Sequence, residues 1–264
     1  MLDLLHVTKT FHPGTVNEKR ALTGVDLHLD DGDFVTVIGG NGAGKSTTLN
    51  AIAGTFPIDG GQILIDGVDI SRLSEHRRAK YIGRVFQDPR MGTAADMEII
   101  ENLALAARRG KRPTLRWGIS SREKAEYCRM LSDFDLGLEE RLSAKVGLLS
   151  GGQRQALTLL MATLAEPKLL LLDEHTAALD PKTAAKVLSL TEQIIAEKHL
   201  TALMVTHNMK DAITYGNKLI MMHDGHVIFE ATGEEKHRLT VETLVRKFSE
   251  ASGEEFASDR TLLS

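Results

Sequence analysis

The sequence predicts an α/β protein with a mostly parallel core, a small antiparallel sheet flanking it and a block of helices inserted between core strands. The apolar, β-branched run 34–38 leads into a glycine-rich loop and then a helical pattern, as in the strand–loop–helix units of parallel sheets. Asp-Gly pairs at 31–32, 66–67 and 224–225 join strand patterns as hairpin turns do. Between about 89 and 165 the apolar period changes to that of helices.

The strand patterns show either alternating or continuous apolar residues. Residues 2–8 fit a strand weakly, whereas Val25, Leu27 and Leu29 alternate with polar residues, which indicates one buried face. The run 169–172 is wholly apolar, as in a parallel strand buried on both faces. Further strands are expected at 63–65, 81–86, 201–206, 218–222 and 227–229.

The helix patterns begin after turn or capping residues. The helix that follows the glycine loop is expected to end at Gly54. Ile99, Leu103 and Ala106 lie on one helical face. A further helix is expected directly after Ser121, through Arg129, with Ser121 preceding it. Others are expected from Arg154 to Ala165 with Ser150 as N-cap, and from about Thr240. The basic loop 108–113 is expected to be a solvated connection, with contact to lipid or nucleic acid as the alternative. We expect the tail from Ala251 to be mobile.

The composition excludes several classes of protein. The chain has 264 residues, of which 42% are hydrophobic and 26% charged, as in an ordinary soluble globular protein. A net charge of −4 argues against a general nucleic-acid binder. The only cysteine is Cys128, so no intrachain disulfide can form and a reducing compartment fits. Neither a signal peptide nor a run of membrane-spanning length is evident, and we expect the chain to stay in the cytoplasm.

The glycine loop fits the phosphate-binding pattern Gly-x-x-x-x-Gly-Lys-Ser, from Gly39 to Ser46. Backbone N–H groups can surround a polyphosphate only where no side chain blocks the approach, and a helix N-terminus adds favourable dipole charge. Lys45 is expected to reach the β- and γ-phosphates, and the Ser46 hydroxyl to hold Mg²⁺. The alternative is a glycine-rich turn that binds nothing, which the complete match in a strand–loop–helix context disfavours.

A second glycine pair opens a later helix, in the segment from Leu149 to Gln153. Its exposed N–H groups and positive helix end also suit an anion. Because the sequence contains one P-loop and no second nucleotide motif, we expect this segment to meet the same γ-phosphate from outside.

Polar residues follow several of the predicted core strands. Asp173 suits an outer-shell hold on Mg²⁺ and Glu174 the attacking water, provided that the strand ends at Asp173. Two solvated acids are the alternative. Gln87 and His207 also follow strands, and Phe11 is a candidate for stacking a nucleobase, although an aromatic at a strand end is often simple core.

Together these residues resemble the ATP-binding cassette (ABC) ATPases over about residues 4–230. Gly39–Thr47 is similar to the Walker A loop, Leu149–Gln153 to the LSGGQ signature and Leu169–Glu174 to Walker B with its catalytic glutamate. Gln87 resembles the Q-loop, Ala178-Leu179-Asp180 the D-loop and His207 the switch histidine. The resemblance implies a P-loop NTPase (RecA-like) core, with ATP and Mg²⁺ as cofactors.

The resemblance also implies a set of site residues. Catalysis would involve Glu174, His207, Lys45 and Gln87, and Mg²⁺ would be held by Ser46, Gln87 and Asp173. The nucleotide would contact Phe11, Gly39, Gly40, Asn41, Gly42, Ala43, Gly44, Lys45, Ser46, Thr47, Ser150, Gly151, Gly152, Gln153 and Asp180. One residue departs from the family pattern: His175 stands where many relatives have proline, which puts the local turn in question.

The family implies a head-to-tail homodimer that encloses two ATP molecules, in which the signature of one chain caps the γ-phosphate held by Lys45 of the other. A single cassette per chain resembles bacterial importers, so the expected partners are permease subunits and an extracytoplasmic substrate-binding protein, at the cytoplasmic face of the membrane. Amino-acid uptake is the favoured class, and no nucleic acid is expected. The alternatives are a soluble cassette ATPase acting on an assembly scaffold or nucleic acid, and a small-molecule P-loop kinase.

These interpretations divide the chain into three parts. We expect residues 1–88 and 166–230 to form the ATPase core with its antiparallel β-subdomain. Residues 89–165 would form the helical subdomain that carries the signature, and residues 231–264 a short C-terminal helix and tail.

Overall fold

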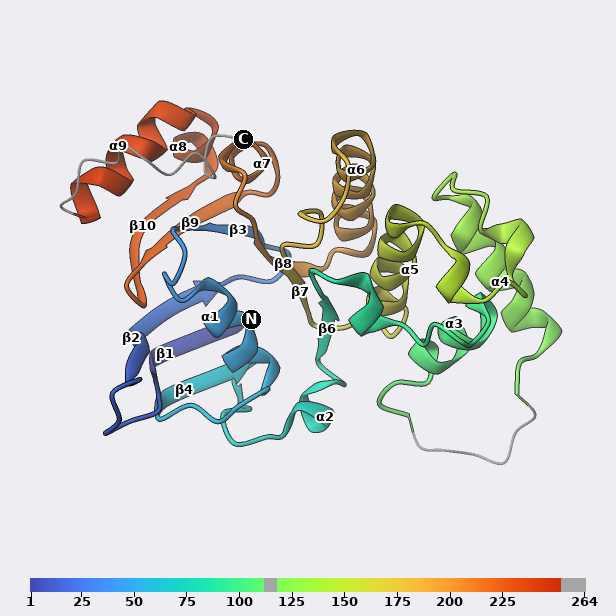
Figure 1. Ribbon diagram of the computed structural model, residues 1–264, viewed down its shortest axis with the longest axis horizontal. Helices are drawn as coiled ribbons and strands as arrows, with labels where there is room; N and C mark the ends of the chain where they lie inside the picture. The colour runs from blue at the N-terminus through green and yellow to red at the C-terminus, as the bar shows by residue number, and fades with distance from the viewer. Residues whose placement is uncertain (112–117, 253–264) are drawn as a thin grey trace. The chain divides into compact units, whose positions relative to one another are not determined.

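The protein is described by a computed structural model that covers residues 1–111 and 118–252 (Figure 1). The chain forms two compact units, one of Met1–Arg78 with His199–Ser264 and the other of Ala79–Lys198. The expected three-part division stays a prediction. The end of the basic loop and the tail after helix α9 lie outside the described residues.

The first unit contains an antiparallel sheet with strand order β2-β1-β4-β5. Leu2, Leu4 and Val7 of β1 are buried, so these side chains belong to the core. The strand runs from Leu2 to Phe11 and is longer than the weak pattern at 2–8 indicated. The four strands are β1 (Leu2–Phe11), β2 (Lys19–Leu29), β4 (Gly60–Ile65) and β5 (Val68–Asp69).

The same unit contains the parallel strands that lead to the glycine loop. Strand β3 (Phe34–Ile38) is wholly buried and lies between β8 (Thr201–Val205) and β9 (Lys218–His223), parallel to both. Strand β10 (His226–Thr232) pairs with β9 in antiparallel register. The helices of this unit are α1 (Lys45–Ala53), α2 (Glu75–Arg78), α7 (Met209–Thr214), α8 (Gly233–His237) and α9 (Val241–Ser252).

Two of the three predicted Asp-Gly hairpins are confirmed and one is wrong. Both residues of the turns 66–67 and 224–225 have positive φ, as a tight two-residue hairpin requires, and these turns join β4 to β5 and β9 to β10. In the pair 31–32 only Gly32 has positive φ. The turn therefore carries the chain out of the antiparallel sheet, and β2 and β3 belong to different sheets.

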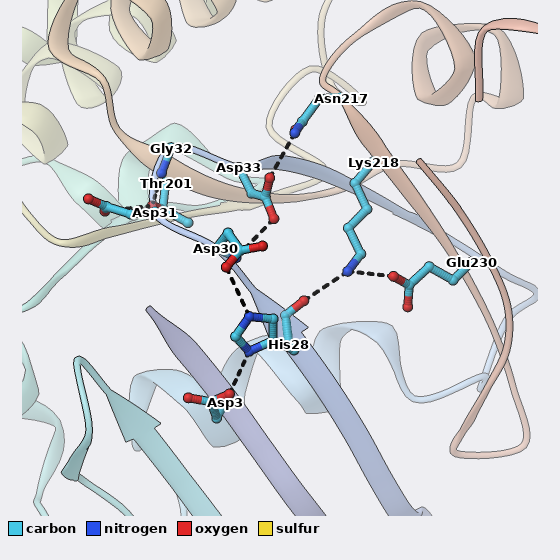
Figure 2. Close-up of polar contacts among 10 residues, drawn as sticks. All are labelled: Asp3, His28, Asp30, Asp31, Gly32, Asp33, Thr201, Asn217, Lys218 and Glu230. Carbon is cyan, nitrogen blue, oxygen red and sulfur yellow. Dashed lines mark hydrogen bonds and ion pairs between the residues drawn. The ribbon is translucent and has the colours of Figure 1, made fainter. Parts of the chain in front are cut away.

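A polar cluster joins the amino ends of β3, β8 and β9 (Figure 2). The backbone N–H of Phe34 donates to Asn217 Oδ1 at 2.8 Å, and Lys218 Nζ donates to the carbonyl of His28 at 2.9 Å and pairs with Glu230 at 2.5 Å. The glycine loop follows the carboxyl end of β3, at the opposite edge of these strands. The cluster therefore holds the amino ends of β3, β8 and β9 together, and the glycine loop lies at their carboxyl ends.

The second unit is built around the parallel pair β6 (Ile82–Val85) and β7 (Leu169–Asp173). Helix α5 begins at Gly151, three residues before the expected start, and Ser120 rather than Ser121 caps α4. Among the described residues, no helix has the length and apolar character needed to cross a bilayer. The helices are α3 (Ile99–Ala107), α4 (Ser121–Ser132), α5 (Gly151–Thr163) and α6 (Pro181–Lys198), with short 3₁₀ turns at Pro89–Gly92, Glu139–Arg141 and Val146–Leu148.

Candidate functional site

The glycine loop between β3 and α1 turns on residues with unusual backbone angles. Gly39, Gly42 and Gly44 have φ of 152°, 83° and 99°, which L side chains rarely adopt. Lys45 is buried at 5% exposure, and its Nζ donates to the carbonyls of Gly39 at 2.7 Å and Gly40 at 3.0 Å. The lysine ammonium is thus held against the backbone of the glycine loop.

The β9–β10 hairpin packs against the backbone of this loop. The N–H of Gly225 donates to the carbonyl of Ala43 at 3.1 Å. A Cβ atom on Gly39 would lie 2.2 Å from the carbonyl oxygen of Met222, so the loop packs closely against the backbone of β9. Glycine is therefore required at position 39 for packing as well as for conformation.

Two other predicted site residues of the first unit lie close to the loop through strand pairing. Thr206 N–H donates to the carbonyl of Val37 at 3.1 Å, so His207 leaves β8 at the edge where the glycine loop leaves β3. Phe11 pairs across the sheet with Lys19, whose Nζ lies 3.4 Å from where a Cβ on Gly42 would be.

The Phe11 ring also meets Phe56 edge to face, with centroids 5.2 Å apart. Phe11 is half-buried, and this contact fixes the orientation of its ring.

In the second unit, strand β7 ends at Asp173, which is the condition that the sequence set for the paired roles of Asp173 and Glu174. Glu174 has φ of 46°, in the left-handed region, so the chain turns sharply directly after the strand. Two consecutive acids can then be presented at one edge of the sheet, because the strict alternation of strand side chains stops at Asp173.

Arg84 is a contact that the sequence analysis missed. It lies on β6, and its Nη2 is 3.4 Å from Asp173 Oδ2, with both side chains largely buried. Its guanidinium also lies 4.5 Å from the centroid of the Phe86 ring. The alternation of β6 could have placed Arg84 on one face, but only the pairing of β6 with β7 shows that it faces Asp173.

His175 lies directly after Glu174 and is turned into the core, where it is 2% exposed. Its Nε2 lies 3.1 Å from Thr191 Oγ1 on α6. The Thr191 hydroxyl donates its hydrogen to the carbonyl of Val187, so it accepts from His175, which places the imidazole proton on Nε2. Burial lowers the pKa of His175 to about 4, and the ring is therefore neutral at pH 7.

The segment from Leu149 to Gln153 forms a capping box at the start of α5. Ser150 Oγ accepts from the N–H of Gln153 at 3.2 Å, and Gln153 Oε1 accepts from the N–H of Ser150 at 3.1 Å. Gln153 Nε2 also donates to the carbonyl of Leu136 at 3.1 Å. These side chains order the helix start, and exposed Gly151 contributes the bare backbone there.

The other predicted site residues of this unit have clear local contacts. A Cβ on Gly152 would lie 2.1 Å from Thr183 Cγ2, so glycine allows α5 and α6 to approach each other. Asp180 accepts from the N–H of Thr183 at 3.1 Å at the start of α6, and hydrogen bonding to Thr183 holds the pKa of Asp180 below its usual value. Gln87 is exposed and follows β6 closely.

Gln155 is a second residue that the sequence analysis did not single out. It is fully buried on α5, and its Nε2 donates to the carbonyl of Phe86 at 3.2 Å. The helix that begins with the glycine pair is thereby tied to the residue that precedes Gln87. No sequence pattern around Gln155 predicts this contact, because it joins residues far apart along the chain.

Each unit carries groups of the kind that bind a polyphosphate or a magnesium ion. The glycine loop supplies backbone N–H groups, a helix start and a lysine ammonium, which suit a polyphosphate. In the first unit the hydroxyl of Ser46, and in the second unit the carboxylate of Asp173 and the amide oxygen of Gln87, are oxygen donors of the kind that Mg²⁺ prefers.

Comparisons with known proteins agree with this chemistry. Residues 22–177 match the family model described as "ABC transporter". The chain is 46% identical over 257 residues to the tyrosine transport ATP-binding protein of Clostridioides difficile, covering 95% of this chain and 100% of that protein. It is 33% identical to the phosphonates import ATP-binding protein PhnC 2 of Cupriavidus metallidurans, covering 94% of this chain and 90% of that protein.

The fold is also similar to solved structures. The dimeric post-hydrolysis state of the ATP-binding cassette MJ0796, bound to ADP and Pi, superposes with a TM-score of 0.74 at 31% identity. The superposition covers 88% of this chain and 98% of that one.

Proposed function

The chain belongs to the ABC transporter family and is an ATP-hydrolysing subunit of a membrane transporter, and we propose that it powers the uptake of an amino acid. Its full-length similarity at 46% identity to a tyrosine transport protein carries this proposal and makes tyrosine the first substrate to test. The phosphonates relative, whose name specifies import, supports the direction of transport.

We assign nucleotide binding to the loop Gly39–Thr47, with Lys45 neutralising the β- and γ-phosphates and Phe11 stacking on the adenine. Ser46, Asp173 and Gln87 would hold Mg²⁺, which supplies positive charge to the phosphate oxygens when it is bound. The hydrogen bonds from Lys45 Nζ to two loop carbonyls support this assignment, because they hold the ammonium where a bound polyphosphate would need it.

Hydrolysis requires a group that polarises the attacking water. We assign this role to Glu174, with His207 steadying the water and Gln87 linking the site to the helical block. The left-handed backbone at Glu174 supports the assignment, because the chain leaves the strand there and the strict alternation of strand side chains no longer holds after Asp173. A capped helix start at Ser150, with Gly151 exposed, suits contact with a γ-phosphate.

The first unit supplies the P-loop and the second the signature, and we infer that two copies assemble head to tail so that each nucleotide meets both. Ser150, Gly151, Gly152, Gln153 and Asp180 of one copy would face the loop of the other. The dimeric state of the MJ0796 cassette supports this arrangement. Permease subunits would anchor the dimer at the cytoplasmic face of the membrane, with an extracytoplasmic binding protein delivering the substrate.

Reconstitution tests this proposal directly. The chain, its copurifying polytopic membrane protein and the binding protein are placed in proteoliposomes with ATP on the side of the cassette, and uptake of labelled tyrosine is measured together with phosphate release. We expect tyrosine to stimulate both, and phosphonate or spermidine to stimulate neither. A Glu174→Gln preparation is the matched control for uptake that does not depend on hydrolysis. ATP-dependent outward movement of tyrosine, or copurification with a soluble scaffold or nucleic acid, would overturn the importer assignment.

A further inference from the structure

Gly40 is a glycine that neither the loop pattern nor the backbone requires. In the pattern Gly-x-x-x-x-Gly-Lys-Ser it occupies the first variable position. Its φ lies outside the left-handed region, unlike that of Gly39, Gly42 and Gly44, so the backbone could accommodate a side chain. The reason for glycine must therefore come from packing.

That packing comes from the C-terminal helix. A Cβ on Gly40 would lie 3.3 Å from Cζ of Phe248, and among the described residues no other atom outside its chain neighbours comes within 4 Å. Phe248 lies on α9, about two hundred residues further along the chain, and is 3% exposed. Its ring meets the His223 ring edge to face, with centroids 5.4 Å apart. It belongs to an apolar cluster that also contains Ile38, Met221 and Leu244, so it is held firmly in place.

We propose that Phe248 is a positioning residue for the nucleotide loop, and that α9 is thereby part of the structure that sets nucleotide affinity. The β9–β10 hairpin supports the loop at Gly39 and Ala43, while α9 supports it at Gly40 through the tip of the Phe248 ring. The inference rests on the proposed role of Gly39–Thr47 as the phosphate-binding loop.

The position of Gly40 matters because its carbonyl accepts the hydrogen bond from Lys45 Nζ at 3.0 Å. A methyl group at residue 40 would be closer to the Phe248 ring than most Cβ contacts are, so either the ring or the loop must move by a few tenths of an ångström. Since the ring is fixed among buried neighbours, the loop yields, and both the Lys45 acceptor and the loop N–H groups shift away from the phosphates.

A double-mutant cycle tests this idea in the full chain. Gly40→Ala should weaken the binding of a fluorescent ATP analogue by about tenfold, the scale of a modest overpacking. Phe248→Leu removes Cζ, the atom in contact, while keeping an apolar side chain. In the double variant Gly40→Ala/Phe248→Leu, affinity should return to within about twofold of the wild type. Phe248→Tyr, which adds an oxygen at Cζ, should weaken binding in the same direction as Gly40→Ala.

Gly118→Ala is the matched control, because nothing in the described part of the chain lies within 4 Å of the added methyl and the φ of Gly118 is not left-handed. It should bind the analogue as the wild type does. An equal loss of affinity from Gly40→Ala in the wild-type background and in the Phe248→Leu background would overturn the proposal, as would wild-type affinity in Gly40→Ala.

Two further measurements separate the possible failures: the affinity of Lys45→Ala tests the assignment of the loop, and the melting temperature without nucleotide tests whether the Gly40–Phe248 contact is only structural. If Lys45→Ala binds the analogue as tightly as the wild type, the loop assignment fails. A Gly40–Phe248 coupling in the melting temperature without one in affinity would show a purely structural contact and would overturn the positioning role.

Discussion

Acid should destabilise this protein partly through His175, a neutral histidine buried beside the proposed catalytic glutamate. The ring is 2% exposed and donates from Nε2 to Thr191, and its pKa is lowered from 6.5 to about 4 by burial. In the unfolded chain the same side chain is hydrated and takes up a proton near pH 6.5. The unfolded state therefore binds more protons between these two values, and the free energy of unfolding falls as the pH falls.

The magnitude follows from the difference in pKa. A difference of about 2.5 units corresponds to about 3 kcal/mol when the pH lies below both values. The free energy of unfolding is not reduced by His175 above about pH 7.5, and it is lower by about 2 kcal/mol at about pH 5. This is a large share of the total stability of a typical domain.

Urea unfolding of the wild type and of His175→Gln, at several pH values between about 8 and about 4.5, isolates the contribution. Gln does not titrate and offers an N–H donor near the position of Nε2, so the difference between the two proteins cancels the carboxylates that they share. We expect the stability of the wild type, relative to His175→Gln, to fall by about 2 kcal/mol between about pH 8 and about pH 5. A stability difference that stays constant with pH would show that His175 is not a buried neutral group, as would an NMR titration of His175 with a midpoint near its ordinary pKa.

Particular contacts support three more predictions. Arg78 is 1% exposed and donates four hydrogen bonds to carbonyls, including those of Ala51 and Ile52 near the end of α1, so Arg78→Met should lower the free energy of urea unfolding by about 3 kcal/mol. Hydrogen bonds to Asp3 and Asp30 raise the pKa of His28 above 6.5, so the protonated His28 ring should stabilise the fold below pH 6.5, and this stabilisation should be lost as the pH rises through the raised value. Because the ring is exposed, His28→Gln should change the free energy of urea unfolding at about pH 5.5 by less than about 1 kcal/mol. Glu174→Gln should bind ATP, release phosphate at least about a hundredfold more slowly and accumulate as a closed dimer in size-exclusion chromatography, and turnover at the wild-type rate would remove Glu174 from the mechanism.

Much of the fold could be predicted because its signals are local. The buried run 34–38, the glycine loop and the helix after it form one continuous segment, and their conformations follow from sterics and hydrogen bonding inside that segment. The end of β7 at Asp173 was set in the same way, by the change from apolar to acidic residues. The hairpin predicted at 31–32 failed because an Asp-Gly pair permits more than one turn geometry, and the choice between them depends on the sheet that β3 joins.

Residue type and short spacing were enough to predict the chemistry of the site, namely the phosphate-binding backbone, the lysine, the acids and the capping serine, and these roles stay predictions. The contacts that hold these groups in place depend on the complete fold. Arg84 faces Asp173 through the pairing of β6 with β7, His175 turns inward because α6 offers a buried hydroxyl, and Phe248 bounds the loop at Gly40. Such contacts join residues distant along the chain, and no local pattern encodes them because packing is resolved only when all the elements are in place.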